Sequence, residues 1–252
     1  MRAHKHFFIR TLLVLGICLV LSAVGPIYTA RAETLTVNTF VDEFDGTCDA
    51  THCSLRDAIY VANSNSDPST IILPAGTYPL TRVGYDDNSG DLDIIEDVIL
   101  SGAGAEQTLI DAQALTDERI FDVQNGAEVT ISGLTVSYGR GNLGGGVSCI
   151  NSTLTLNSVT VRQNVSSSYG GGIYSDTCNL TLDNTWVTAN SAAEGGGGIY
   201  LYDSEVVINE SIITGNSTGE SYTGGGVYCY DSRLSMTETS LSENSSGSGG
   251  GI

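Results

Sequence analysis

The sequence has very few basic side chains. It contains 10 lysines and arginines against 29 acidic residues, and the only lysine, Lys5, lies within the first ten residues. A chain with so strong an acidic excess repels nucleic acid and anionic membranes, so neither is expected as a partner. The same excess favours solubility and the binding of cations.

Residues that move protons are also scarce. Beyond residue 32 the chain has one histidine, His52, and its arginines are isolated from one another. A polysaccharide lyase needs a basic residue to remove a proton beside a carboxylate, and a glycoside hydrolase needs paired carboxylates across a groove. Acidic pairs such as Asp86 and Asp87 occur, but no recognisable catalytic set does, so we predict no catalytic residues.

The first 32 residues have the composition of a signal peptide. A basic start precedes an apolar run over residues 12–24, and an Ala-x-Ala motif at residues 30–32 closes the segment. The run is too short and wrongly flanked for a stable membrane span, and the motif is typical of signal-peptide cleavage. We therefore expect a secreted or cell-surface protein that is cleaved near Ala32 and has no transmembrane span in its mature chain.

From residue 144 onward the chain repeats one 21-residue unit four times and then begins a fifth. Each unit opens with three glycines, at Gly144, Gly170, Gly196 and Gly224, so the spacing is 26, 26 and 28 residues. All variation in length falls in the polar stretch after the last Asn of a unit. A period of this size indicates a solenoid.

Apolar residues recur at fixed positions of the unit, two apart within segments such as LTL at residues 154–156. This alternation predicts short strands with one buried face. A single coil cannot bury that face against itself, so each coil must stack edge to edge on the next, about 4.8 Å away. The sequence therefore predicts an all-β fold, a parallel β-helix.

An Asn closes the same corner of every unit, and Gly139 takes that place one coil upstream. Such an Asn bonds its own turn and stacks its amide on the next coil, which predicts an internal ladder. The alternative is a set of unrelated, solvated turn residues. The triple glycines open each coil, where the turn requires positive φ. The predicted ladder consists of Asn164, Asn190, Asn216 and Asn244.

Five cysteines remain after residue 32, in a compartment that permits disulfides. Cys48 and Cys53 flank a four-residue loop and are predicted to be bridged. Cys149 and Cys178 fall near the same corner of adjacent coils, a position that admits a second bridge and leaves Cys229 unpaired. A metal site built on the first pair and its neighbouring histidine is the alternative, but the spacing matches no standard zinc pattern.

Residues 33–66 are predicted to cap the first coil. A strand is expected at TLTVNTF (residues 34–40), and a short amphipathic helix at residues 54–63 with Ser54 as its N-cap. A solenoid needs its first open edge covered, and this strand-loop-helix unit is placed to do so.

The cap sequence DGTCDATHCSLRDAIYVAN, at residues 45–63, resembles the signature of secreted bacterial proteins named for a Cys-Ser-Leu-Arg-Glu-Ala motif, with Asp57 in place of Glu. GDLDI at residues 90–94, ISGLT at residues 131–135 and the GGGI repeats are similar to the β-helices that follow this motif. The resemblance implies a right-handed, pectin-lyase-like β-helix over residues 67–252.

The repeats are also similar to the GGAI and FxxN repeats of polymorphic outer-membrane proteins, although Gly replaces Ala throughout and Phe is absent at the FxxN motif. Neither resemblance implies an activity, because the wider fold hosts pectin-degrading enzymes, lyases, adhesins and structural surface proteins.

Two rows of tyrosines form the candidate binding surface. By strand alternation they follow the buried Ile or Val column and face outward. Exposed aromatics beside acids are suited to the apolar faces and hydroxyls of an extended glycan. The alternative is a tyrosine ladder that only stabilises the sheet. The rows are Tyr174, Tyr200 and Tyr228, and Tyr202 and Tyr230 with Asp203 and Asp231 beside them.

An acidic loop upstream is the candidate metal site. Carboxylates alternate around Gly90 and offer the hard oxygen ligands that calcium prefers, although their spacing is not that of an EF-hand. The alternative is a solvated turn that leads into the next strand. The predicted calcium ligands are Asp86, Asp87, Asn88, Asp91 and Asp93.

These features predict a structural, adhesive or glycan-binding module without catalysis, whose partner is a polysaccharide or another cell-surface component. A carbohydrate-active enzyme on the same fold, a polysaccharide lyase or a glycoside hydrolase, is the alternative. The sequence stops at the opening of a fifth coil, so we expect a longer protein that supplies more coils and a cap.

Overall fold

The computed structural model of this chain describes residues 33–84, 88–113 and 117–252. The predicted signal peptide lies outside these ranges, as do Asp86 and Asp87 of the predicted calcium site. The described residues belong to one compact unit. No helix in the described part of the chain has the length and apolar character needed to cross a membrane.

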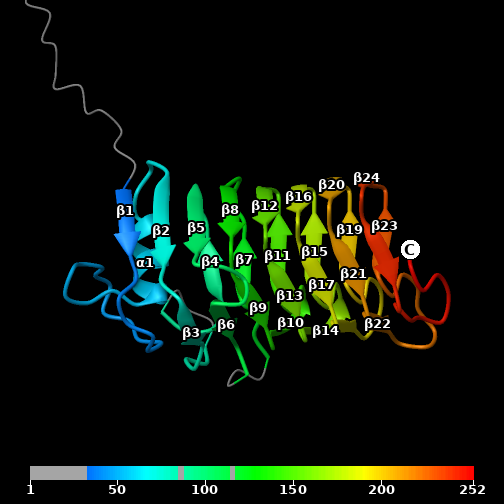
Figure 1. The fold of residues 1–252 in the computed structure, drawn as a ribbon, viewed down its shortest axis with the longest axis horizontal. Helices are drawn as coiled ribbons and strands as arrows, with labels where there is room; N and C mark the ends of the chain where they lie inside the picture. The colour runs from blue at the N-terminus through cyan, green and yellow to red at the C-terminus, as the bar shows by residue number, and fades with distance from the viewer. Residues whose placement is uncertain (1–32, 85–87, 114–116) are drawn as a thin grey trace, which may run out of the picture. The chain divides into compact units, whose positions relative to one another are not determined.

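The chain winds through parallel sheets as a right-handed β-helix, which confirms the predicted fold (Figure 1). We name the sheets A to D. In the later coils the chain passes from C to A to B to D, and each strand pairs with its counterparts in the neighbouring coils. Sheet A contains β1 (Glu33–Thr36), β2 (Ser69–Leu73), β5 (Val98–Gly102), β8 (Glu128–Ser132), β12 (Thr153–Asn157), β16 (Asn179–Asp183), β20 (Glu205–Asn209) and β24 (Arg233–Thr237).

The other three sheets complete each coil. Sheet B contains β3 (Gly76–Pro79), β6 (Thr108–Asp111), β9 (Thr135–Ser137), β13 (Thr160–Arg162), β17 (Trp186–Thr188), β21 (Ile212–Thr214) and β25 (Ser240–Ser242). Sheet C contains β4 (Leu92–Ile94), β7 (Phe121–Val123), β11 (Val147–Ile150), β15 (Ile173–Asp176), β19 (Ile199–Tyr202) and β23 (Val227–Tyr230). Sheet D contains β10 (Arg140–Leu143), β14 (Val165–Tyr169), β18 (Ser191–Ala192) and β22 (Ser217–Thr218).

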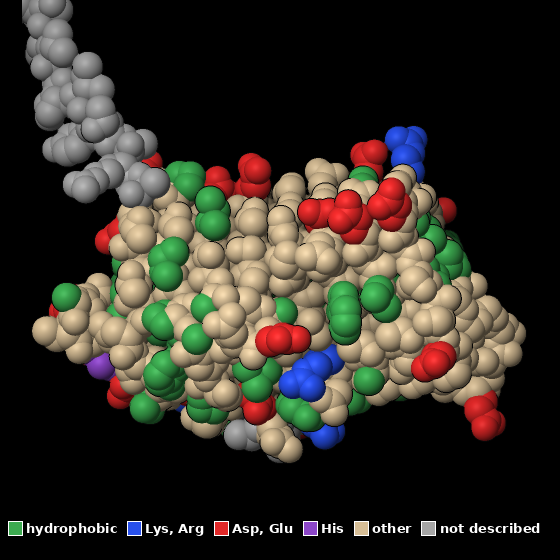
Figure 2. Space-filling view, viewed as in Figure 1, with side chains coloured by type: hydrophobic (Ala, Val, Ile, Leu, Met, Phe, Trp, Pro, Cys, Tyr) green, Lys and Arg blue, Asp and Glu red, His purple; other side chains and the backbone are tan. Residues whose placement is uncertain are grey.

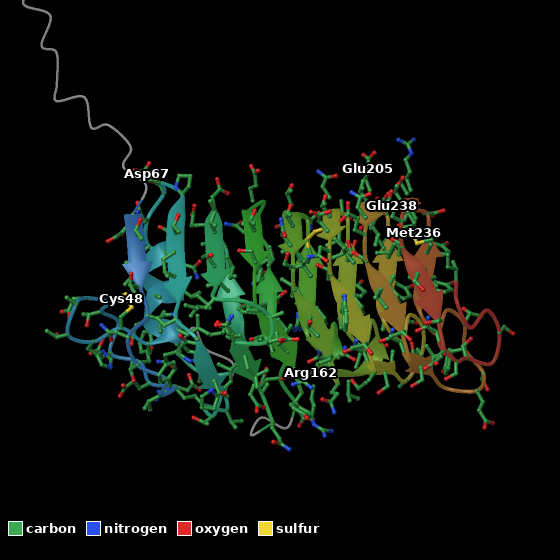
Figure 3. The ribbon with its side chains drawn as sticks, in the orientation of Figure 1. Cys48, Asp67, Arg162, Glu205, Met236 and Glu238 are labelled. Carbon is green, nitrogen blue, oxygen red and sulfur yellow. A yellow bond between two sulfur atoms is a disulfide. The ribbon has the colours of Figure 1, made fainter. Side chains whose placement is uncertain are left out.

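The predicted apolar columns form the core. Leu154, Leu180 and Val206 are register partners on adjacent coils, and each is at most 1% exposed. Burial of a Leu or Val side chain stabilises the fold by about 1.5–3 kcal/mol. Because every coil contributes the same columns, the core runs without interruption along the solenoid. Outward side chains such as Glu205 and Arg162 project from opposite sides of it (Figure 3).

Each corner of the solenoid is a tight turn that begins with a residue in the left-handed conformation. A non-glycine residue pays roughly 1–2 kcal/mol for that conformation. The cost is offset because the amide of the corner residue still donates to the next coil, as Thr177 N does to Tyr202 O at 3.0 Å. The corner residues are Asn151, Thr177, Asp203 and Asp231 between sheets C and A; Ser158, Asn184, Glu210 and Glu238 between A and B; and Tyr138, Gln163, Ala189, Gly215 and Glu243 between B and D.

The asparagine ladder lies at the corner between sheets B and D. Asn164 donates from both its backbone N and its Nδ2 to Asn190 Oδ1, at 3.0 Å in each case, and Asn190 makes the same two bonds to Asn216. Asn216 continues the ladder to Asn244. At the upstream end Gly139 N donates to Asn164 Oδ1 at 2.9 Å, so the ladder begins one coil after Gly139.

The cap covers the first coil through β1 and the helix α1 (Leu55–Asn63). β1 pairs with β2 and so forms the first strand of sheet A. Ser54 is the N-cap, as predicted, because its Oγ accepts from Asp57 N at 3.0 Å. Asp57 Oδ2 in turn accepts from Ser54 Oγ at 2.7 Å, so the two side chains satisfy the first turn together.

All six residues of the CSLRDA segment, residues 53–58, are buried. Arg56 shows why a cation sits inside the cap: its Nε donates to Asp42 Oδ1 at 2.8 Å and its Nη2 donates to Gly90 O at 3.0 Å. Asp42 Oδ2 accepts from Thr81 N. The buried pair therefore ties the cap to the first coils.

Both predicted disulfides are present. Cys48 is bonded to Cys53 in the cap, which removes both thiols from the alternative metal site (Figure 3). Cys149 is bonded to Cys178 and crosslinks two adjacent coils. Cys229 is free and half-buried.

Candidate functional site

One column of sheet C brings together four of the predicted site residues, namely Asp93, Tyr174, Tyr200 and Tyr228. Register pairing aligns the column across six strands, from β4 to β23. Its upstream end is acidic and its downstream end is aromatic. In order along the solenoid the column reads Asp93, Asp122, Ser148, Tyr174, Tyr200 and Tyr228.

The acidic end holds three carboxylates. Oxygens of Asp91, Asp93 and Asp122 lie within 4.8 Å of one another. Asp91 and Asp93 belong to the predicted calcium set, whereas Asp122 joins them from the next coil. The backbone oxygen of Asn88 instead accepts from Arg82 Nε at 2.7 Å.

Arg119 supplies the counter-charge of this cluster. Its Nε lies 3.3 Å from Asp91 Oδ2, and its Nη1 lies 3.0 Å from Asp122 Oδ2. Burial raises the pKa of Asp91, although Arg119 opposes that rise. Burial also raises the pKa of Glu118, and the charge of Asp91 adds to the increase. A cation that bound here would compete with the guanidinium for the same oxygens.

The tyrosine column is a stack of rings. The ring centroids of Tyr174 and Tyr200 are 5.6 Å apart, those of Tyr200 and Tyr228 are 5.0 Å apart, and the planes are nearly parallel. Tyr169 packs on Tyr200 from the side, at 4.6 Å. The stacked rings cover one another's faces and present their edges outward, so this column offers hydroxyl groups rather than flat platforms.

Tyr174 corrects the expectation of an exposed row. Its side chain is only 8% exposed, and its hydroxyl lies 3.3 Å from Asp176 Oδ2. Burial, together with the nearby Asp176, raises its pKa to about 12. The pKa of Tyr169 is raised to about 12 by its hydrogen bond to Glu194.

The second tyrosine row is open to solvent. Tyr202 and Tyr230 are 41% and 47% exposed, and their rings stack at 5.5 Å with an interplanar angle of 6°. Asp203 and Asp231 follow them in the chain at the corner between sheets C and A. Figure 2 shows a row of acidic side chains over this corner, where β15, β19 and β23 lead into β16, β20 and β24.

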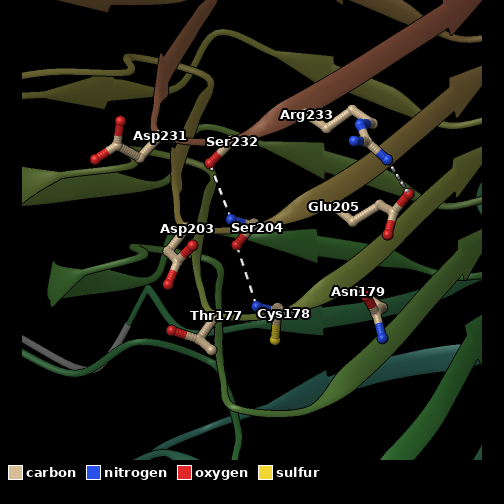
Figure 4. A pocket seen from close by; sticks show the side chains of 9 residues that line it. All are labelled: Thr177, Cys178, Asn179, Asp203, Ser204, Glu205, Asp231, Ser232 and Arg233. Atoms are coloured by element: carbon tan, nitrogen blue, oxygen red, sulfur yellow. Dashed lines mark hydrogen bonds and ion pairs between the residues drawn. The ribbon is translucent and has the colours of Figure 1, made fainter.

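An open pocket of about 580 Å³ runs along that corner (Figure 4). Serines hold its floor in register: Ser204 Oγ accepts from Cys178 N at 3.1 Å, and Ser232 Oγ accepts from Ser204 N at 3.0 Å. Carboxylates flank the floor on both sides. The lining residues are Thr177, Cys178, Asn179, Asp203, Ser204, Glu205, Asp231, Ser232 and Arg233.

This corner pocket offers hydrogen-bonding groups that repeat once per coil. Its acids and amides are exposed, and its one basic side chain, Arg233, is 3.5 Å from Glu205. Such a surface fits a ligand that carries many hydroxyl groups at regular intervals. Its acidic character disfavours a polyanion.

Three residues of the outer surface were missed by the sequence reasoning. Asp122 and Arg119 complete the acidic cluster, but the upstream coils have irregular lengths that hide their register. Trp186 was overlooked as well. Strand alternation places its side chain outward, because the side chain of its neighbour Val187 belongs to a buried column.

The cap holds a second group of carboxylates around His52. His52 Nε2 lies 2.7 Å from Glu43 Oε1, and His52 Nδ1 lies 3.3 Å from Asp45 Oδ2. The hydrogen bond to Glu43 raises the pKa of the imidazole. Because Asp57 Oδ1 already accepts from two backbone amides, the group acts as an internal clamp of the cap.

Comparison with known proteins identifies one family. The family model described as "Right handed beta helix region" matches residues 102–248. No curated protein and no solved structure matches the chain.

Proposed function

Because the chain belongs to the family of right-handed β-helix proteins, we propose that it is a non-catalytic module, secreted or held at the cell surface, that binds an extended glycan. The binding surface is the corner between sheets C and A, with the exposed tyrosine pair beside it. The glycan is neutral or cationic.

The pocket at this corner carries the proposal. Polar side chains recur there at the coil spacing of about 4.8 Å, so a chain of sugars that lies along the solenoid meets equivalent groups at each step. The pocket volume of about 580 Å³ falls within the roughly 300–1,000 Å³ of small-ligand sites. Asp203 and Asp231 are placed to accept from sugar hydroxyls.

The state of the acidic cluster supports binding rather than catalysis. General acid-base hydrolysis requires two carboxyl groups that are free to reach opposite sides of the substrate. Here Arg119 holds Asp91 and Asp122 together. The raised pKa values of Asp91 and Glu118 favour a hydrolase as second candidate.

The test is retention of the purified protein on a panel of immobilised neutral, amino-sugar and acidic polysaccharides. A double variant, Asp203→Asn with Asp231→Asn, removes two charges and keeps side chains that tolerate the left-handed corner. Its matched control is Glu210→Gln with Glu238→Gln, which makes the same charge change at the corner between sheets A and B.

Retention is expected on a neutral or amino-sugar polymer, and it should weaken in the aspartate variant but not in the glutamate variant. Each lost charged hydrogen bond corresponds to about 1.5–3 kcal/mol, so the aspartate variant should lose more than tenfold in affinity. Equal behaviour of the two variants contradicts the assigned surface. Release of reducing ends without stoichiometric binding would contradict the proposal of a non-catalytic binding module and would support a hydrolase instead.

A further inference from the structure

The only tryptophan of the sequence is exposed to solvent. Trp186 begins β17, and its backbone N donates to Val159 O at 2.9 Å, so the strand is fixed while the indole projects outward. Its side chain is 52% exposed. Its register partners in sheet B are Thr160 and Ile212, both half-buried.

The indole forms one wall of an open pocket of about 360 Å³ at the corner between sheets A and B. The opposite wall is the loop at residues 103–107, which precedes β6. Sheet B places β9 and β13 between β6 and β17, so the pocket spans three coil steps. That length is roughly 14 Å, comparable to a trisaccharide.

The loop at residues 103–107 is held before any ligand arrives. Gln107 N donates to Gly104 O at 2.8 Å, Gly104 N donates to Gly133 O at 2.8 Å, and Thr135 Oγ1 donates to Ala105 O at 2.6 Å. Gly104 has φ +137°, and a Cβ there would lie 3.3 Å from Gln107 Nε2. The glycine therefore lets the Gln107 amide lie across the loop, and little ordering is left for binding to supply.

Polar groups surround the indole on the rest of the rim. Asn184 Nδ2 donates to Ser158 Oγ at 3.0 Å, which joins two neighbouring coils. Gln107 and Glu106 are exposed on the far wall. The pocket thus combines one broad apolar face with amide, hydroxyl and carboxylate groups at its edge.

The indole of Trp186 differs from the rings of the tyrosine column, which pack on one another. In the described part of the chain no aromatic ring packs on it. A pyranose ring has the matching shape, with axial C–H groups on one face and hydroxyls around its edge. Glu106 disfavours a sugar that carries a carboxylate or sulfate.

We propose that Trp186 is the platform of a second glycan site, separate from the corner between sheets C and A. The indole stacks on the apolar face of one neutral or cationic pyranose, and Gln107, Asn184 and Ser158 bind its hydroxyls. The site holds about three sugars between the indole and the loop. It does not depend on the proposed function of the other corner.

The single tryptophan makes the test specific. Intrinsic indole fluorescence of the full chain is titrated with cellotriose, maltotriose and chitotriose, because every change in emission then reports on Trp186. At least one of these trisaccharides is expected to change the emission saturably and to protect the indole from acrylamide quenching. Gln107→Ala should weaken that affinity about two- to twelvefold, as loss of a single hydrogen bond predicts.

The controls separate this site from the other corner. Asp203→Asn with Asp231→Asn should leave the fluorescence titration unchanged, whatever happens to retention on immobilised polysaccharide. Trp186→Ala removes a side chain that lies outside the core, so the variant should keep the far-ultraviolet circular dichroism spectrum of the parent chain. Calorimetry should detect no binding of that trisaccharide to this site in the variant. The inference is overturned if no trisaccharide alters the emission, or if Gln107→Ala binds as tightly as the parent.

Discussion

Asn190→Ala tests the asparagine ladder at a buried position within it. The side chain is 1% exposed and lies in the middle of the ladder. Its Oδ1 accepts from the backbone N and from Nδ2 of Asn164, and its Nδ2 donates to Val161 O at 2.9 Å and to Asn216 Oδ1. Alanine removes all four bonds and leaves the backbone amide of Asn164 buried without an acceptor, whereas Asn164 Nδ2 keeps its bond to Val136 O at 3.2 Å.

The expected cost follows from that orphaned amide. A buried donor without a partner costs about 1–3 kcal/mol, and each lost neutral hydrogen bond about 0.5–1.5 kcal/mol. Part of this overlaps, so we expect a loss of about 2–4 kcal/mol in the free energy of unfolding. Asn244→Ala is the matched control. Because Asn244 is only half-buried and water can reach its partner, its loss should cost about 1 kcal/mol.

Urea unfolding and amide hydrogen exchange measure the two variants. Solenoids lose cooperativity between distant coils, so exchange shows where the destabilisation falls. In Asn190→Ala it should be largest at residues 160–166, 186–192 and 212–218, the three coils that the side chain joins. Equal costs for Asn190→Ala and Asn244→Ala, or a cost below about 1 kcal/mol for the former, would refute the ladder as a source of stability.

Three further predictions concern the cap and the acidic cluster. Arg56→Met leaves the Asp42 carboxylate buried without its cation, so urea unfolding should show a loss of about 3–5 kcal/mol in the free energy of unfolding. The further substitution Asp42→Asn should recover at least half of that loss. No recovery would contradict the pairing. The His52 imidazole should titrate by nuclear magnetic resonance above its ordinary pKa of 6.5, and Glu43→Gln should lower that value. Because the folded-state pKa is raised, its contribution to stability is fully present below pH 6.5 and is lost as pH rises through the folded value; a titration at or below 6.5 would contradict the contact. Calcium should raise the melting temperature no more than magnesium at equal ionic strength, because Arg119 already occupies oxygens of Asp91 and Asp122. A larger rise with calcium would instead support a calcium site at this loop.

Patterns that repeat were predictable from the sequence. The buried columns, the ladder and the bridge between Cys149 and Cys178 all follow from aligning one coil on the next, because in-register stacking gives equivalent residues equivalent neighbours. The cap helix was predictable for a local reason, since Ser54 and Asp57 carry the signals that start a helix.

Features that depend on irregular coils or on backbone strain were not predictable. The acidic cluster joins Asp91 to Asp122 across coils whose lengths differ from those of the repeats, so no alignment placed them together. Thr177 adopts a left-handed conformation that β-branched residues avoid, and only the bond that its amide makes to the next coil explains it. Trp186 was within reach of strand alternation, but its pocket was not, because the opposite wall comes from a loop three coils upstream.

The segment between each ladder asparagine and the next run of glycines is where the repeats differ in length. Before the three glycines that open the next unit, five residues fill it after Asn164 and after Asn190, seven after Asn216 and four after Asn244. Sheets A, B and C keep their register across these changes. One flank can therefore accumulate insertions while three faces stay constant, so duplication of a coil lengthens the molecule without redesigning it. Evolution can therefore change the loops on that flank and the number of coils independently of each other.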